Sequence, residues 1–134
     1  AEKDPTADVE GIDAANKLSI LMALCFDKYV APDQIPTTGI SKITADDIKA
    51  ATEAGKKMKL IGRAVLKDGE VEYSVQPLRV PVSHPLAGVS NEFNAVYITG
   101  DKVGELMFYG RGAGPLPTGS AVCGDILSIM KSKF

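Results

Sequence analysis

Residues 58–76 read Met-Lys-Leu-Ile-Gly-Arg-Ala-Val-Leu-Lys-Asp-Gly-Glu-Val-Glu-Tyr-Ser-Val-Gln, and this stretch decides the fold class. The Asp68-Gly69 pair favours the primed turns that close a tight β-hairpin. After the turn, apolar residues alternate with polar ones, and the apolar set is Val71, Tyr73 and Val75. Because successive side chains of a strand point to opposite faces, one face of this return strand is expected to be buried. The stretch therefore predicts an antiparallel hairpin that turns at residues 67–70.

Two helices are predicted before the hairpin. The first is largely apolar and runs over residues 9–27, with Asp8 as its expected N-cap. The second opens at Thr44-Ala-Asp-Asp47, which is close to a capping box, and Gly55 is expected to end it.

After the hairpin, three prolines predict an irregular segment at residues 77–85. Two further strands are expected at 94–99 and 105–109, and a last helix at 118–131. This order predicts an α+β fold, with an antiparallel or mixed sheet of at least four strands packed with about three helices.

The bulk composition fits one domain over residues 1–134 and excludes several function classes. The net charge of −2 gives no electrostatic case for nucleic acid or an anionic membrane surface. No apolar run reaches the roughly 18 residues that a membrane-spanning helix requires. The single histidine has no partner at metal-ligand spacing, so no metal site is expected. Cys25 and Cys123 are interpreted as reduced core residues of a cytosolic protein. The chain starts with Ala rather than Met, which suggests an excised piece of a longer protein.

Asp13 and Lys17 place a carboxylate and an amine one helical turn apart, at the polar end of an otherwise apolar helix. At 100° per residue they lie about 40° apart on one face. Ile20 and Leu24 extend that stripe, so we expect the pair to be desolvated or to line a cavity. The alternative is an ordinary i,i+4 ion pair that stabilises a helix by about 0.3–0.5 kcal/mol.

Gly110-Arg-Gly112-Ala-Gly114 precedes the last predicted helix. A glycine-rich loop that enters a helix N-terminus can bind an anion. However, the third glycine of the dinucleotide fingerprint is missing at its required spacing, and so is its downstream acid. A strand-to-helix turn that needs unusual backbone angles is the alternative.

The segment from Asp8 to Leu18, Asp-Val-Glu-Gly-Ile-Asp-Ala-Ala-Asn-Lys-Leu, resembles the signature of homoserine dehydrogenase. Other matching motifs occur in order along the whole chain: Gly39-Ile40, Asp46-Asp47-Ile48, Lys59-Leu60, Val80-Pro81, His84-Pro85-Leu86, Asn94-Ala95-Val96, Gly112-Ala-Gly114 and Pro117-Thr118. The resemblance implies the substrate-binding and dimerisation region of that enzyme, with a preceding dinucleotide-binding domain missing. It also implies that the helix at residues 117–134 packs toward that missing domain.

The family interconverts L-homoserine and L-aspartate 4-semialdehyde by hydride transfer with NAD or NADP, in threonine and methionine biosynthesis. The sequence leaves open which of the two cofactors is used. The resemblance implies a cytoplasmic homodimer. It further implies that Lys17 is catalytic with Asp13 as its partner, and that Asp8 and Glu2 bind homoserine. The loop of Gly112, Ala113 and Gly114 would then lie near the cofactor. The alternative function is a non-catalytic small-molecule-sensing or dimerisation module that keeps the helix motif as a scaffold.

Overall fold

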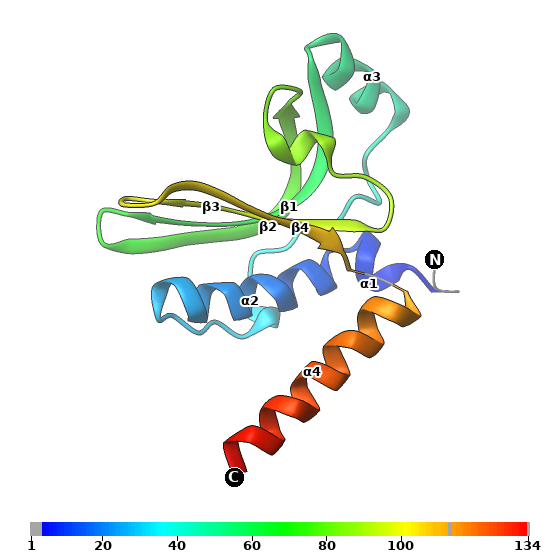
Figure 1. The fold of residues 1–134 in the computed structure, drawn as a ribbon. Helices are drawn as coiled ribbons and strands as arrows, with labels where there is room; N and C mark the ends of the chain where they lie inside the picture. Colours follow the sequence, from blue (N-terminus) through cyan, green and yellow to red (C-terminus); the bar gives the residue numbers. More distant parts are fainter. Residues whose placement is uncertain (1–3, 113, 134) are drawn as a thin grey trace. The chain divides into compact units, whose positions relative to one another are not determined.

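The computed structural model describes residues 4–112 and 114–133, and the chain divides between Val82 and Ser83 into two compact units. The first unit contains helices α1 (Thr6–Val9), α2 (Ile12–Phe26) and α3 (Ala45–Glu53), the 3-10 turn η1 (Pro32–Gln34), and strands β1 (Lys56–Lys67) and β2 (Glu70–Pro81). The second contains the 3-10 turn η2 (Pro85–Gly88), strands β3 (Phe93–Gly100) and β4 (Gly104–Arg111), and helix α4 (Pro115–Lys133) (Figure 1).

Strands β1 and β2 form the predicted antiparallel hairpin, which closes at the Lys67–Glu70 pair. Asp68 and Gly69 both have positive φ angles, 52° and 84°, as a type I′ turn requires. Strand β2 continues beyond Gln76 to Pro81, so the expectation of an irregular segment from residue 77 was wrong for its first part. Proline has no backbone N–H to donate. It is tolerated in an edge strand, where an N–H on the open side would not bond to a neighbouring strand.

The core of the first unit lies where α2 packs against the β1–β2 hairpin (Figure 1). Its buried apolar members are Ala15, Leu18, Met22, Val30, Ile35 and Val75. The one buried polar side chain described is Ser19, whose hydroxyl donates to the Val30 carbonyl at 2.5 Å. That bond satisfies the hydroxyl, so its burial does not leave an unpaired polar group.

The first predicted helix is interrupted. Gly11 has a left-handed φ of 80° and separates α1 from α2, so Asp8 lies within α1 and is not the N-cap of a continuous helix. By contrast, α3 begins as predicted, because Thr44 and Asp47 form a reciprocal capping box. Gly55 follows the end of α3 with a positive φ of 67°.

In the second unit, β3 and β4 pair antiparallel over their whole length, from Phe93–Arg111 to Gly100–Gly104. Helix α4 begins at Pro115, three residues before the predicted start at Thr118. Proline suits the first turn of a helix, where its missing N–H would have no intrahelical partner.

The α+β class is therefore confirmed, and among residues 4–112 and 114–133 the strand pairing is antiparallel except for an isolated parallel bridge between Thr37 and Val75. The described strands form two two-stranded sheets, so the single sheet of at least four strands stays a prediction. Cys25 and Cys123 are free thiols as expected, but both are exposed, and their placement in the core was wrong. No described helix is long and apolar enough to cross a membrane.

Candidate active site

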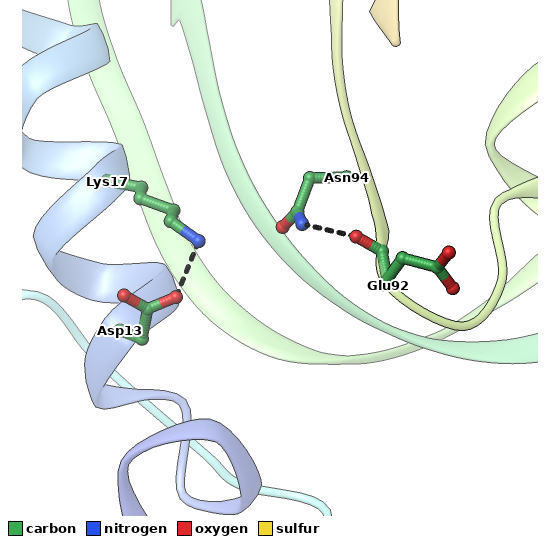
Figure 2. Close-up of polar contacts among 4 residues, drawn as sticks. All are labelled: Asp13, Lys17, Glu92 and Asn94. Atoms are coloured by element: carbon green, nitrogen blue, oxygen red, sulfur yellow. Dashed lines mark hydrogen bonds and ion pairs between the residues drawn. The ribbon is translucent and has the colours of Figure 1, made fainter. Parts of the chain in front are cut away.

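The predicted Asp13–Lys17 pair forms in the first turns of α2. Lys17 Nζ lies 2.6 Å from Asp13 Oδ2, as Figure 2 shows. The spacing follows from helix geometry, because residues four apart are neighbours on one face. The side chains are 56% and 44% exposed, respectively, so solvent reaches both charges.

The expectation that this pair lies on an inward stripe was wrong. Ile20 and Leu24, which extend the stripe, are 61% and 77% exposed. Helix α2 instead buries its opposite face against the hairpin, through Ala15, Leu18, Ser19 and Met22. Gly62 of β1 lies opposite this face, where an added Cβ atom would be 3.5 Å from Leu18 Cβ. The pair is thus presented on an open surface of the first unit.

Asp8 lies in α1 and is exposed, on the element immediately before the paired residues. The two helices meet at Gly11, where a Cβ atom would lie 3.1 Å from both Thr37 Cγ2 and Val75 Cγ1. Close packing and the left-handed backbone therefore both require glycine at this position. The structure thus places Asp8 on a short helix that joins α2 through Glu10 and the tightly packed Gly11.

Glu2 lies outside the described residues. A carboxylate that sequence reasoning missed, Asp4, accepts hydrogen bonds from the backbone N–H and the hydroxyl of Thr6. These bonds lower the pKa of Asp4 below its usual 3.8, the side-chain bond being the larger cause. The pattern Asp-Pro-Thr before α1 is the signal that could have found these local bonds.

In the second unit, Gly112 lies directly after β4 and against Asn94 of β3. A Cβ on Gly112 would clash with Asn94 Nδ2 and lie 2.7 Å from Asn94 Cγ. The Glu92 carbonyl accepts from both residues: from Gly112 N at 3.2 Å and from Asn94 Nδ2 at 3.5 Å, the latter drawn in Figure 2. The Asn94 side chain therefore packs closely against Gly112, the first of the three residues expected near the cofactor, a relationship that the sequence did not reveal.

The loop expected near the cofactor also includes Ala113 and Gly114, and we call residues 112–114 the glycine segment. Ala113 lies outside the described residues. Gly114 has a left-handed φ of 108°, which confirms the expectation of an unusual backbone angle before the last helix. The first turn of α4 contains Pro115 and Pro117, which carry no N–H. The N–H of Thr118 donates to the Gly114 carbonyl. This helix start therefore offers few free donors for an anion.

His84 has a structural role in the second unit. Its Nδ1 accepts the Leu86 N–H at 3.2 Å, and its ring centroid lies 4.7 Å from that of Tyr97. The Tyr97 hydroxyl hydrogen-bonds Glu105, and this bond raises the pKa of Tyr97 above its usual 10.0. Among residues 4–112 and 114–133, no group of three His, Cys, Asp or Glu side chains is placed to hold a metal ion.

Comparison with known proteins gives one consistent family. Residues 1–127 match the family described as Homoserine dehydrogenase. Homoserine dehydrogenase of Bacillus subtilis is 50% identical over 132 residues, which cover 98% of this chain and 30% of that protein. The enzyme of Corynebacterium glutamicum is 47% identical over 138 residues, covering 99% of this chain and 31% of that protein.

Solved structures agree with the sequence comparison. A crystal structure of Staphylococcus aureus homoserine dehydrogenase has a TM-score of 0.87 and 47% identity, covering 97% of this chain and 33% of that chain. A crystal structure of homoserine dehydrogenase from Thiobacillus denitrificans has a TM-score of 0.89 and 44% identity, and the match covers 94% of this chain and 29% of that chain. The chain belongs to the homoserine dehydrogenase family. It spans about 30% of the length of the curated relatives named here.

Proposed function

We propose that this chain is the substrate-binding and catalytic region of an NAD- or NADP-dependent homoserine dehydrogenase, which interconverts L-homoserine and L-aspartate 4-semialdehyde. The observation that supports it most is the Asp13–Lys17 pair, held at 2.6 Å and open to solvent in the segment that resembles the family signature. A charged pair that is neither buried nor needed by the core is free to meet a substrate.

In this proposal Lys17 moves the proton. When homoserine is oxidised, Lys17 first releases a proton to solvent, and its neutral Nζ then accepts the hydroxyl proton as the hydride leaves the carbon that bears the hydroxyl. In the reverse direction the Lys17 ammonium donates a proton to the aldehyde oxygen. Asp13 orients Nζ and balances its charge.

The remaining carboxylates bind the substrate. Asp8, exposed on α1, is suited to the α-ammonium group of homoserine, and we assign Glu2 the same role. Opposite charges attract without covalent chemistry, so these residues position the substrate and do not take part in the proton transfer.

The nicotinamide cofactor supplies the site that accepts or donates the hydride. Gly112, Ala113 and Gly114 are the residues of this chain that we place beside it. A segment of small residues suits close approach by a flat ring. The two prolines at the start of α4 leave too few donors for a pyrophosphate cradle, so this segment fits a partial contact. We infer that a separate dinucleotide-binding domain binds most of the cofactor, and that residues 117–134 pack toward it.

We further propose a cytoplasmic homodimer, with the exposed apolar side chains of β4 in the interface between the two copies. Strand β4 is exposed along its length, and its large apolar residues are Leu106, Met107, Phe108 and Tyr109. Apolar surface of this extent commonly marks an interface.

The test is a steady-state assay of the full-length enzyme that contains this chain, following homoserine-dependent reduction of NAD or NADP. Turnover that collapses in Lys17→Ala supports the proposal. The alternative, a sensing or dimerisation module, predicts homoserine binding without turnover.

A further inference from the structure

Residues 36–40, which we name the α1 tether, join strand β2 at Val75 to the end of α1. On one side, Val75 N donates to the Pro36 carbonyl at 2.9 Å and Thr38 N donates to the Val75 carbonyl at 2.8 Å. On the other side, Ile40 N donates to the Val9 carbonyl at 2.8 Å. Main-chain bonds therefore attach this segment both to β2 and to the helix that carries Asp8.

Gly39 lies at the point where the tether meets α1. A Cβ atom on Gly39 would lie 2.6 Å from the Val9 carbonyl oxygen and 2.6 Å from Glu10 Cα. Non-bonded carbon atoms are comfortable at about 3.5–4.0 Å, so no side chain fits there unless backbone moves. Gly39 is not among the glycines with positive φ, so the requirement is steric and not conformational.

Burial decides which backbone would move. The tether is bonded to Val75, which is fully buried, whereas α1 is four residues long and has no buried residue. A side chain at position 39 would therefore push α1 away and leave the hairpin in place. The Asp13–Lys17 pair lies within α2, so its internal geometry would not change.

We propose that Gly39 is a positioning residue that sets the location of Asp8 relative to Lys17 through the α1 tether. This inference rests on the proposed function, in which Asp8 binds the substrate ammonium and Lys17 transfers the proton.

The test compares Gly39→Ala, Asp8→Asn and the double variant in the full-length enzyme. For Gly39→Ala we expect the KM for homoserine to rise on the order of ten- to a hundredfold, since small misplacements of a positioning group have effects of this size. We expect kcat and the KM for the cofactor to change less than about threefold. Gly62→Ala is the matched control, because its Cβ meets α2 at an ordinary 3.5 Å from Leu18 Cβ.

The double variant separates the inference from the proposed function. If the tether acts through Asp8, adding Gly39→Ala to Asp8→Asn raises the KM no further, because the two changes remove one interaction. An unchanged KM in Asp8→Asn overturns the role of Asp8, and the inference with it. Two outcomes would overturn the role of Gly39 and leave that of Asp8 intact. The first is a raised KM in Asp8→Asn with a normal KM in Gly39→Ala. The second is an additive rise of the KM in the double variant.

A second measurement uses the unmodified enzyme and does not depend on any variant folding. Coupling between two sites is reciprocal, so homoserine bound at Asp8 must stabilise the tether. Hydrogen exchange of the Ile40 amide should slow at least severalfold when homoserine is added. The Gln34 amide, which donates to the Ala31 carbonyl within η1, should not respond. Equal protection of Ile40 with and without homoserine contradicts the inference.

Discussion

Lys17 Nζ lies 2.6 Å from Asp13 Oδ2, and both side chains remain about half exposed. Exposed ion pairs of this kind typically contribute 0.2–1 kcal/mol, roughly, to the free energy of unfolding. The pair therefore contributes little to the free energy of unfolding. The predictions for this pair accordingly concern the reaction rate.

Lys17→Ala in the full-length enzyme should lower kcat by roughly 10²–10⁴-fold, the usual effect of losing a positioned proton-transfer group. Its melting temperature should change little. Asp13→Ala should lower kcat by a similar or smaller factor. Lys49→Ala is the matched control, since Lys49 forms an exposed i,i+4 pair with Glu53 at 4.0 Å in α3. Turnover close to that of the unmodified enzyme in Lys17→Ala would remove this lysine from the mechanism.

Gly112→Ala should raise the KM for the cofactor, because the new methyl group displaces Asn94 and shifts the glycine segment. We expect an increase on the order of tenfold, equivalent to about 1.4 kcal/mol. Gly110→Ala should have no such effect, because a Cβ there meets nothing within 4 Å.

Removing the obstructing side chain supplies the complementary test. In an Asn94→Ala background, Gly112→Ala should be nearly neutral, because the atoms it would strike are gone. An equal penalty in both backgrounds would show that the packing of Asn94 on Gly112 is not the reason for glycine at this position.

Asp47→Asn should lower the melting temperature at pH 7. The Thr44 hydroxyl and backbone N–H donate to Asp47 and hold its pKa below the usual 3.8, the side-chain bond being the larger cause. A carboxyl group whose pKa is lower in the folded state contributes stability that is complete above its unfolded pKa. That contribution disappears as the pH falls through the folded pKa. The difference between the two proteins should therefore shrink below about pH 3.8, as thermal melts across pH would record. A difference independent of pH contradicts this assignment, and Asp46→Asn is the control in the same turn.

Residues 1–134 alone should show no micromolar binding of NADPH in calorimetric titration and no dehydrogenase activity. The sequence contains no strand followed by the full dinucleotide glycine fingerprint, and the start of α4 is poor in N–H donors. A tight site in this chain would show that the cofactor is held here and not by a separate domain.

The same chain should self-associate as a two-fold dimer, because closed two-fold pairing is the commonest way to cover an apolar face. Sedimentation equilibrium at micromolar concentration should give twice the chain mass of 14.1 kDa. Phe108 is 61% exposed on β4, and Phe108→Glu should shift the equilibrium toward monomer. A monomer across this concentration range in the unmodified chain would rule out the proposed interface.

The sequence by itself determined the elements whose signals are local. The Asp68-Gly69 turn closes the hairpin because both residues accept positive φ, whatever surrounds them. Thr44 and Asp47 open α3 because their bonds span only three residues. The Asp13–Lys17 contact also follows from helix spacing alone. Each of these features depends on neighbours in the chain, which a sequence displays directly.

Only the tertiary structure decided which surfaces face outward and where long segments meet. The break between α1 and α2 places Gly11 beside Thr37 and Val75, which are distant in sequence and leave little room for a Cβ atom. Asn94 covers Gly112 because the register of β3 with β4 brings them together. The outward direction of the Asp13–Lys17 stripe followed from the choice of the opposite face of α2 for the core. An apolar pattern identifies faces that can be buried, but only packing against a specific partner selects the one that is.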